Sequence, residues 1–298
     1  MHFVLTVIGG PDSRALDASV LDAAMLALGE AGASHAAPIW LDPGIACDIP
    51  IESAMPKSAE LAVRERLAGA HLDLAVLPVE GRRKALLVAD MESTIIAEEL
   101  LDELADFLGI RPQIAEITAR SMAGELDFEP AIKERVRLLA GLPAATLAQV
   151  GARVTLNPGA RTLVQTMRAQ GAHTALVSGG FTHFTEDVRA RCGFHEAHGN
   201  RLIVTDGALS GEVGEPILGP PAKRETLESL CAELGLTAQD TCAVGDGSND
   251  VAMVEVAGLG VAYRAKSVLR AAAPICIDHG DLTALLYLQG YRRDEFRS

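Results

Sequence analysis

Two acidic residues follow an apolar run in the stretch LLVADMESTIIAEE, which spans residues 86–99. Asp90 ends the run, and Glu92 comes two residues later. A carboxylate at the tip of a buried strand is placed to act as a nucleophile or to bind a hard cation. Taken alone, Asp90 could also be a helix N-cap, because Asp, Ser and Thr are favoured there. The choice depends on which other residues the fold brings to the same place.

Two more polar turns that contain glycine follow predicted strands, at residues 178–180 (Ser-Gly-Gly) and 245–250 (GDGSND). In open parallel sheets ligands bind beyond the carboxyl ends of the strands, so neighbouring strands would bring these turns and Asp90 to one pocket. Clustered carboxylates repel unless a cation lies among them, and oxygen ligands without His or Cys suit Mg²⁺. Backbone N–H groups and the Ser178 hydroxyl suit phosphate oxygens. Lys223, which begins the predicted helix AKRETLESL, would complete the charge balance.

The chain from Lys84 onward has the pattern of an α/β fold. KALLVAD is a continuous apolar run, as expected of a strand buried on both faces. Helical segments are then predicted at 95–109, 112–126, 128–141 and 144–153, after which strands and helices alternate. A hairpin is predicted around Asp206-Gly207. We therefore expect a doubly wound parallel sheet with a Rossmann-type core, and the helical insert, about residues 97–155, is expected to lie over it as a cap.

Residues 1–80 form a separate block. FVLTVIG is typical of a strand, an amphipathic helix follows and closes at Gly32, and a strand region broken by Pro and Gly comes next. A second helix (SAELAVRERLAGA) and a strand (LDLAVLPV) complete the block. The order β-α-β-α-β, with a hairpin in the middle, is the outline of a small α+β ferredoxin-like sandwich. The predicted domains are thus 1–80 and 81–298.

Composition limits the function. Of the 298 residues 49% are hydrophobic and 22% charged, so a packed core is expected. A net charge of −14 makes sequence-independent binding to nucleic acid a poor prospect. We find no apolar run long enough for a membrane span and no signal-peptide pattern, and we expect a cytoplasmic protein. The five cysteines are scattered and form no Cys-x-x-Cys pair, which argues against disulfides and a thiolate zinc site.

Four stretches in order resemble the motifs of the haloacid-dehalogenase (HAD) superfamily of phosphohydrolases. They are DMESTII (90–96), where the superfamily usually has Asp-x-Asp-x-Thr, VSGGF (177–181), Lys223 and GDGSNDVAM (245–253). The resemblance covers about residues 84–290. Within the superfamily, the sequences of residues 124–139 and 197–211 resemble those of the phosphoserine phosphatases. One motif alone would be weak support for the resemblance. Four motifs in the same order, with these two sequences between them, are specific for it.

The resemblance implies a two-step hydrolysis of O-phospho-L-serine, the last step of serine biosynthesis. Asp90 would attack phosphorus and form an aspartyl-phosphate. Glu92 would protonate the leaving oxygen and then activate the water that releases phosphate. Mg²⁺ would be held by the Asp90 carboxylate, the main-chain carbonyl of Glu92 and Asp246.

The same resemblance assigns the substrate-binding residues, which are Glu99, Phe128, Arg135, Ser178, Gly179, Gly180, Lys223, Asn249 and Asp250. The second-motif residues and Lys223 would bind the phosphoryl oxygens, and the two fourth-motif residues would steady them. On the predicted cap, Glu99 would bind the ammonium group and Arg135 the carboxylate, with the aromatic ring excluding water. Glu99 and Arg135 could instead be solvated surface charges on amphipathic helices, or an ion pair.

Glu92 departs from the superfamily pattern, which has Asp at this position. The side chain is longer by one methylene, and a misplacement of about 1 Å can cost on the order of a hundredfold in rate. We expect the chemistry to be retained, because both the carboxyl group and the main-chain carbonyl survive the change. The alternatives are a phosphatase of another small phosphomonoester, and a weakly active sensor of amino acids or phospho-amino acids.

The N-terminal block contains no catalytic constellation. Its outline, joined to this kind of phosphatase, resembles the ACT-type regulatory modules, which pair and bind amino acids. The resemblance implies an amino-acid effector and a homodimer. The alternative is a structural or dimerising domain without a ligand.

Overall fold

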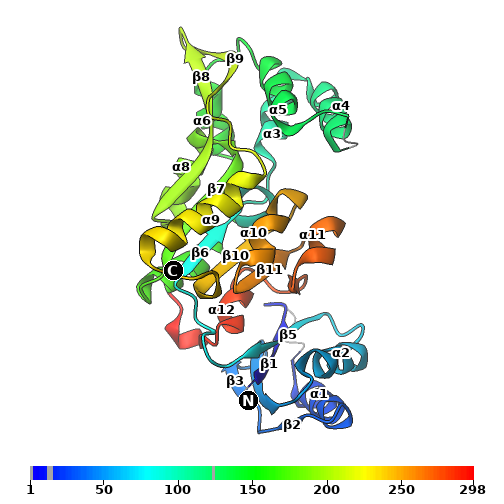
Figure 1. Ribbon diagram of the computed structural model, residues 1–298. Coiled ribbons are helices and arrows are strands. Elements are labelled where there is room, and N and C mark those ends of the chain that lie inside the picture. Colours follow the sequence, from blue (N-terminus) through cyan, green and yellow to red (C-terminus); the bar gives the residue numbers. More distant parts are fainter. Residues whose placement is uncertain (1–2, 12–15, 123–124) are drawn as a thin grey trace.

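The computed structural model describes residues 3–11, 16–122 and 125–298 of the chain. In this part of the chain the strands form two β-sheets, one from the N-terminal residues and a larger one from the rest. Figure 1 shows the N-terminal sheet below the larger one, with helix α12 (Ala284–Leu288) between them.

The N-terminal sheet has the strand order β2-β4-β1-β5, with β3 paired to β4, and its strands pair antiparallel. Its elements are β1 (Phe3–Gly9), α1 (Ala18–Glu30), β2 (Ser34–His35), β3 (Ile39–Asp42), β4 (Ala46–Glu52), α2 (Pro56–Arg66) and β5 (Leu72–Pro78). The predicted order for residues 1–80, with a hairpin in the middle, is found as β1, α1, the hairpin of β3 and β4, α2 and β5, but the structure adds the two-residue strand β2, which was not predicted. The domain boundary at residue 80 and the relation to ACT modules stay predictions.

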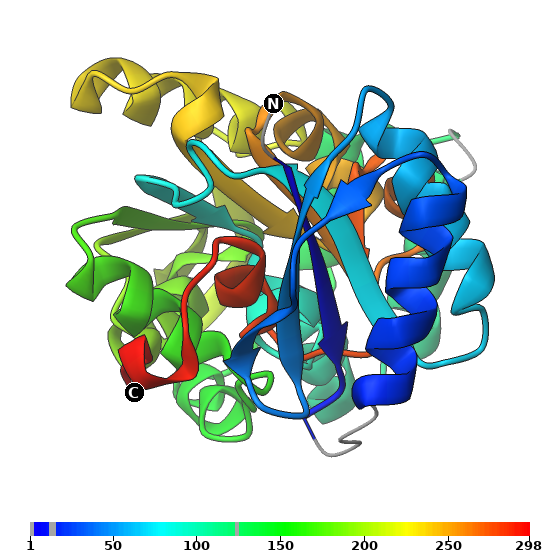
Figure 2. The same cartoon turned by 90° about the horizontal axis from the view of Figure 1, so that it is seen from below.

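Side chains alternate between the two faces of β1 and β4. Leu5, Val7 and Ile49 are buried in one apolar cluster with residues of α1 and α2, so both helices cover that face. Thr6 and Asp48 lie at the intervening positions and face the larger sheet, where they contact Arg82. Figure 2, seen from below, shows the N-terminal strands in front of the larger sheet and the two helices to one side.

The larger sheet has the order β12-β11-β10-β6-β7-β8-β9. Its strands are β6 (Leu86–Ala89), β7 (His173–Phe181), β8 (Glu196–Thr205), β9 (Ala208–Gly214), β10 (Thr241–Gly245), β11 (Leu259–Tyr263) and β12 (Ile275–Ile277). All neighbours pair in parallel except β8 and β9, which form a hairpin closed by Asp206 and Gly207, both at positive φ. The predicted doubly wound parallel sheet and its hairpin are therefore confirmed.

Helices cover both faces of the larger sheet, which explains the unbroken apolar run of β6. Leu87 and Ala89 join the cluster that contains residues of α7 (Ala160–Ala169), α8 (Thr182–Cys192) and α12. Leu86 and Val88 join the cluster on the other face, with residues of α9 (Pro221–Leu234), α10 (Val251–Val256) and α11 (Ser267–Ala272). Because both faces are buried, every position of the strand must be apolar.

The predicted helical insert contains α3 (Leu100–Leu108), α4 (Arg111–Met122), α5 (Phe128–Arg137) and α6 (Ala145–Gly151). The first predicted helix, 95–109, was placed too early. Residues 91–95 form a π-helical turn closed by the N–H of Ile96 on the Met91 carbonyl, and Ile96 then pairs with Leu156. Parts of three predicted elements lie outside the described residues. They are residues 1–2 of the first strand region, residue 15 of the first helix and residues 123–124 of the second insert helix. That the insert, about residues 97–155, acts as a cap over the larger sheet stays a prediction.

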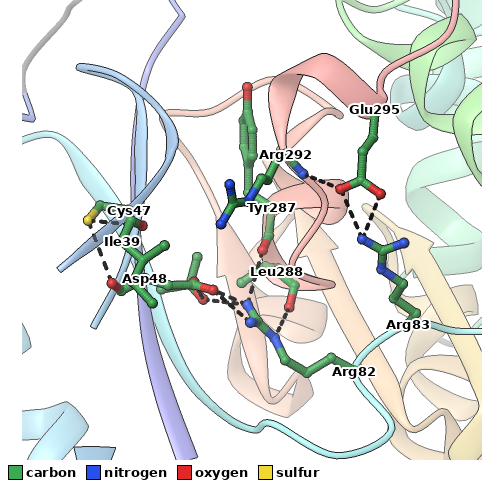
Figure 3. A network of polar contacts seen from close by, with 10 residues as sticks. Ile39, Cys47, Asp48, Arg82, Arg83, Tyr287, Leu288, Arg292 and Glu295 are labelled. Atoms are coloured by element: carbon green, nitrogen blue, oxygen red, sulfur yellow. Dashed lines mark hydrogen bonds and ion pairs between the residues drawn. The ribbon is translucent and has the colours of Figure 1, made fainter. Parts of the chain in front are cut away.

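Arg82, in the connection between the sheets, joins the N-terminal strands to α12 (Figure 3). Its guanidinium donates to both carboxylate oxygens of Asp48, at 2.7 and 3.2 Å, and to the Thr6 hydroxyl at 2.9 Å. It also donates to the backbone carbonyls of Tyr287 and Leu288, at 3.2 and 3.1 Å. The side chains of Arg82 and Asp48 are only 11% and 9% exposed, so this ion pair is largely removed from water.

A second contact joins the two sheets at their edges. The Asp73 carboxylate on β5 accepts hydrogen bonds from the backbone N–H groups of Asp278, His279 and Gly280, which follow β12. Asp73 is buried, so these three donors replace the water that its carboxylate would otherwise bind. The cysteines, all within the described ranges, are free. Over these ranges, the helices are each too short or too polar to cross a bilayer.

Candidate active site

Three neighbouring strands at the centre of the larger sheet carry predicted site residues at their carboxyl ends: Asp90 follows β6, Asp246 follows β10, and Ser178 lies near the end of β7. Ala89 pairs with Val244 on one side and with Leu176 on the other, so Asp90 lies between the ends of β10 and β7. The backbone N–H of Asp90 donates to the Val244 carbonyl, which fixes the start of the turn. The carboxyl ends of neighbouring parallel strands thus bring the three polar turns together, as expected from the sequence.

The strand ends line a cavity of about 170 Å³ that also touches the helical insert. Predicted site residues that line it are Asp90, Glu92, Glu99, Phe128, Arg135, Ser178, Gly179, Gly180, Asp246 and Asn249. The two remaining predicted residues, Lys223 and Asp250, lie buried behind this lining. The predicted set is therefore assembled in one place.

Lys223 is the centre of the buried ion pairs. Its Nζ lies 2.6 Å from Asp90 Oδ1 and 2.5 Å from Asp250 Oδ1. The other oxygen of Asp250 accepts the backbone N–H groups of Asp246 and Gly247, at 3.1 and 2.9 Å. Asp250 is thus fully engaged with protein donors, and it fixes both the lysine and the loop that presents Asp246.

Burial and charge shift the pKa values of this group. Burial raises the pKa of Asp90 well above its ordinary value, and the negative charges of Asp250 and Asp246 add to this rise, against the opposing effect of Lys223. Burial lowers the pKa of Lys223, but the neighbouring Asp90 and Asp250 outweigh it and leave the pKa above its ordinary value. A further cation beside Asp90 would favour its ionised form, which is the form a nucleophile needs.

The carboxylates fit a divalent cation. Oxygen atoms of Asp90, Asp246 and Asp250, all buried, lie within 4.8 Å of one another. Because both Asp250 oxygens are hydrogen-bonded, Asp90 and Asp246 are the two that can turn an oxygen to a metal. An oxygen-only donor set suits Mg²⁺ better than zinc or copper. The donor chemistry therefore agrees with the Mg²⁺ site predicted from the sequence.

Glu92 lies in the cavity wall. Its Oε1 accepts a hydrogen bond from the backbone N–H of Leu100, at 2.8 Å, at the first residue of α3. On its other side lies Gly180, where a Cβ atom would come within 2.9 Å of Glu92 Oε2. Burial, aided by the negative charge of Glu99, raises the pKa of Glu92 to about 7, against the Leu100 N–H and the charges of Lys223 and Arg135. A carboxyl group with this pKa can give and take a proton near neutral pH.

The insert side of the cavity presents one carboxylate (Glu99), one guanidinium group (Arg135) and one aromatic ring (Phe128). Glu99 Oε1 accepts from the Ser93 hydroxyl at 2.8 Å, and Ser93 itself adopts φ 55°, which turns the chain sharply after Glu92. Arg135 on α5 lines the cavity and donates through Nε to the Ala131 carbonyl at 3.2 Å. Phe128 lies against Gly179, since a Cβ there would be 3.6 Å from the ring.

Two residues near the site were missed from the sequence. Lys266, just after β11, lies with its Nζ 3.0 Å from Asp246 Oδ2 and 3.6 Å from Glu99 Oε1, and it lines the cavity. Buried Asn200 on β8 donates to the Gly179 carbonyl and accepts from the backbone N–H of Leu218. The sequence does contain an indication for Lys266. This residue follows β11, which neighbours β10 and ends at the same edge of the sheet. Asn200 had none, because its partners are backbone groups distant in sequence.

Comparisons with known proteins place the chain among relatives of one kind. Residues 87–255 match the family described as haloacid dehalogenase-like hydrolase. A phosphoserine phosphatase of Streptomyces coelicolor is 38% identical over 255 residues, which are 85% of this chain and 62% of the relative. The chain spans about three-fifths of the length of the first curated relatives that it matches.

Solved structures extend the likeness to the fold. The HAD family hydrolase t0658 of Salmonella enterica serovar Typhi is 30% identical, with a TM-score of 0.85, over 96% of this chain and 98% of that one. That likeness therefore includes the N-terminal sheet. A phosphoserine phosphatase captured as a phospho-aspartyl intermediate analogue is 38% identical, with a TM-score of 0.64, over 69% of this chain and 98% of that one.

Proposed function

The chain belongs to the haloacid dehalogenase-like hydrolase family, and on that premise we propose that it is a Mg²⁺-dependent phosphatase that hydrolyses O-phospho-L-serine to L-serine and phosphate. One arrangement supports this proposal above all. Asp90 lies between Lys223 and Asp246 at the base of a cavity whose other side presents Glu99 and Arg135. A phosphate ester that also carries an ammonium and a carboxylate group meets a partner for each of its charges there.

In the first step, an Asp90 oxygen attacks phosphorus while the bond from phosphorus to the serine oxygen breaks. Glu92 gives its proton to the departing oxygen, so that serine leaves as a neutral alcohol. The raised pKa of Glu92 supports this role, because a carboxyl group that holds its proton near neutral pH can serve as the acid. The product on the enzyme is an aspartyl-phosphate of Asp90.

In the second step, Glu92 is ionised and takes a proton from a water molecule, which attacks phosphorus and releases phosphate from Asp90. Lys223, Ser178 and the backbone N–H groups of the second motif offset the charge that spreads over the phosphoryl oxygens. Mg²⁺ bound at Asp90 and Asp246, and at the carbonyl of Glu92, would shield the nucleophile from the like charge of the phosphate. Asn249 would steady the phosphate from the fourth motif.

Arg135 tests the substrate assignment. The Arg135→Ala variant should raise KM for O-phospho-L-serine at least tenfold, since a charged hydrogen bond to the carboxylate is lost. The KM for phosphoethanolamine, which has no carboxylate, should change little. Arg137→Ala, at an exposed position on the same helix, is the matched control. An equal loss for both substrates would point to another small phosphomonoester.

Asp90 tests the mechanism. The Asp90→Asn variant should release no phosphate, while its circular dichroism spectrum and unfolding curve stay close to those of the parent. In the parent enzyme, labelled phosphate should be found on Asp90 after rapid quenching. Tight binding of phosphoserine by the parent without any turnover would favour the sensor alternative. The cytoplasmic location, the place in serine biosynthesis, the homodimer and the amino-acid effector stay predictions.

A further inference from the structure

Lys266 links the two ends of the cavity. Its Nζ lies 3.0 Å from Asp246, which belongs to the proposed metal site, and 3.6 Å from Glu99, which belongs to the proposed ammonium site. The side chain is 61% exposed, whereas Asp246 is 8% exposed. One ammonium group thus contacts both carboxylates that the proposed function assigns to other cations.

The backbone holds this lysine at the rim. After β11 the chain passes through Arg264 at φ 45°, and the Arg264 N–H donates to the Ile277 carbonyl at 2.8 Å. The backbone N–H of Lys266 then donates to the Asp246 carbonyl, also at 2.8 Å. The main chain of Lys266 is therefore tied to the metal-binding loop, and only its flexible stem is free to move.

Two cations of the working site, the metal ion and the ammonium group of the substrate, are electrostatically incompatible with Lys266 in its present place. An ammonium group at 3.0 Å from Asp246 would repel a divalent ion bound to the same carboxylate. The ammonium group of a substrate on Glu99 would be repelled in the same way. A long, largely exposed lysine side chain can leave at little cost, because water replaces its contacts.

We propose that Lys266 is a positioning residue that acts as a placeholder cation. It neutralises Asp246 and Glu99 while the site is empty, keeps the start of α3 beside the β11 end of the core, and is displaced when Mg²⁺ and substrate bind. This inference rests on the proposed function. It implies that Lys266 competes with the metal, and that removing its charge strengthens metal binding.

Direct metal titration tests the competition without any turnover. Mn²⁺, followed by electron paramagnetic resonance in the absence of substrate, should bind Lys266→Met about fivefold more tightly than the parent, the size expected for the loss of one partly exposed ion pair. Lys266→Arg keeps the charge and should bind Mn²⁺ like the parent. Lys133→Met is the matched control. Lys133 is an exposed lysine whose Nζ lies 2.8 Å from Glu215 Oε1, and it does not line the cavity.

Steady-state kinetics provide the second measurement. At saturating Mg²⁺, Lys266→Met should show a lower KM for O-phospho-L-serine and a kcat within about twofold of the parent. Weaker or unchanged Mn²⁺ binding, or a large fall in kcat, would overturn the placeholder role. If the parent binds Mn²⁺ and hydrolyses phosphoserine but Lys266→Met binds no more tightly, this inference alone falls. If the parent does neither, the proposed function falls with it.

Discussion

The Glu92 carboxylate accepts a hydrogen bond from the backbone N–H of Leu100. This N–H is in the first turn of α3, where backbone donors have no acceptor within the helix. This hydrogen bond explains how the longer side chain is accommodated where Asp is usual. The extra methylene carries the carboxyl group to the helix N-terminus, and Gly180 leaves room for its second oxygen. Glu92 therefore has a fixed place in the cavity wall.

Replacing Glu92 should separate its role as an acid from its role in packing. Glu92→Gln can still accept the Leu100 N–H but cannot give a proton, so hydrolysis of phosphoserine should slow by about 10²- to 10⁴-fold. Hydrolysis of p-nitrophenyl phosphate should slow much less in its first step, because its leaving group needs no proton. Burst kinetics with the two substrates would measure this difference, and equal losses would remove Glu92 from the acid role. Glu92→Asp, which is too short to reach Leu100, should fall between the parent and Glu92→Gln.

Removing the metal should stop phosphate release and lower the melting temperature. Because Mg²⁺ binds the folded site and not the unfolded chain, Mg²⁺ at 100 times its Kd should stabilise the fold by about 2.7 kcal/mol, and excess EDTA should remove this stabilisation. The rise in melting temperature on adding Mg²⁺ should be lost in Asp246→Asn and kept in Asp187→Asn, an exposed acid on α8. Hydrolysis that continues undiminished in EDTA would contradict the metal site.

Arg82 should contribute far more to stability than its neighbour Arg83. Arg82→Met leaves the Asp48 carboxylate buried without its cation, and the loss should be about 3–5 kcal/mol in urea unfolding. Arg83→Met is the matched control, because Arg83 and Glu295 are 45% and 27% exposed, and it should cost less than about 1 kcal/mol. Figure 3 shows both arginines in one view. Similar losses for the two variants would mean that the buried pair is worth no more than the exposed one.

Glu196 should give a pH-dependent contribution to stability. Burial raises the pKa of Glu196, but hydrogen bonds with the rings of His173 and His198 outweigh it and hold the pKa below the ordinary value of 4.5. A lowered carboxyl pKa stabilises the fold fully above pH 4.5, and this stabilisation is lost as the pH falls through the folded-state value. Glu196→Gln should therefore cost about 0.5–1 kcal/mol near neutral pH and progressively less in acid. A cost that does not change with pH would mean that the carboxylate charge is not involved, with exposed Glu186→Gln as the control.

The sequence predicted the site residues better than it predicted the insert. Asp90, Ser178 and Asp246 each lie at or just after the carboxyl end of a buried strand, and the geometry of parallel sheets alone brings such positions together. The start of α3 was misplaced because the π-helical turn at residues 91–95 depends on Ser93 at positive φ, which local propensity does not indicate. Helix α7 was not predicted at all.

Contacts between side chains of segments far apart in the chain could not be predicted from the sequence. Nothing in the order of residues shows that Lys266 reaches Glu99, since this depends on where the fold places the insert relative to the end of β11. The bond from Leu100 to Glu92 depends in the same way on where the helix begins. Such contacts follow from tertiary packing, which periodicity and turn residues do not specify.

The partners of Arg82 have a consequence for the order in which the molecule is made. Arg82 and the Leu288 carbonyl are 206 residues apart, and Arg82 also holds Asp48 of the N-terminal sheet. During synthesis the N-terminal strands leave the ribosome long before α12 exists, so the face that contains Thr6 and Asp48 stays uncovered until nearly the whole chain has been translated. That face also carries Ile8, Leu41 and Ala75, which pack into the core of the larger sheet in the finished fold, so the nascent chain exposes apolar side chains beside the polar ones for this interval.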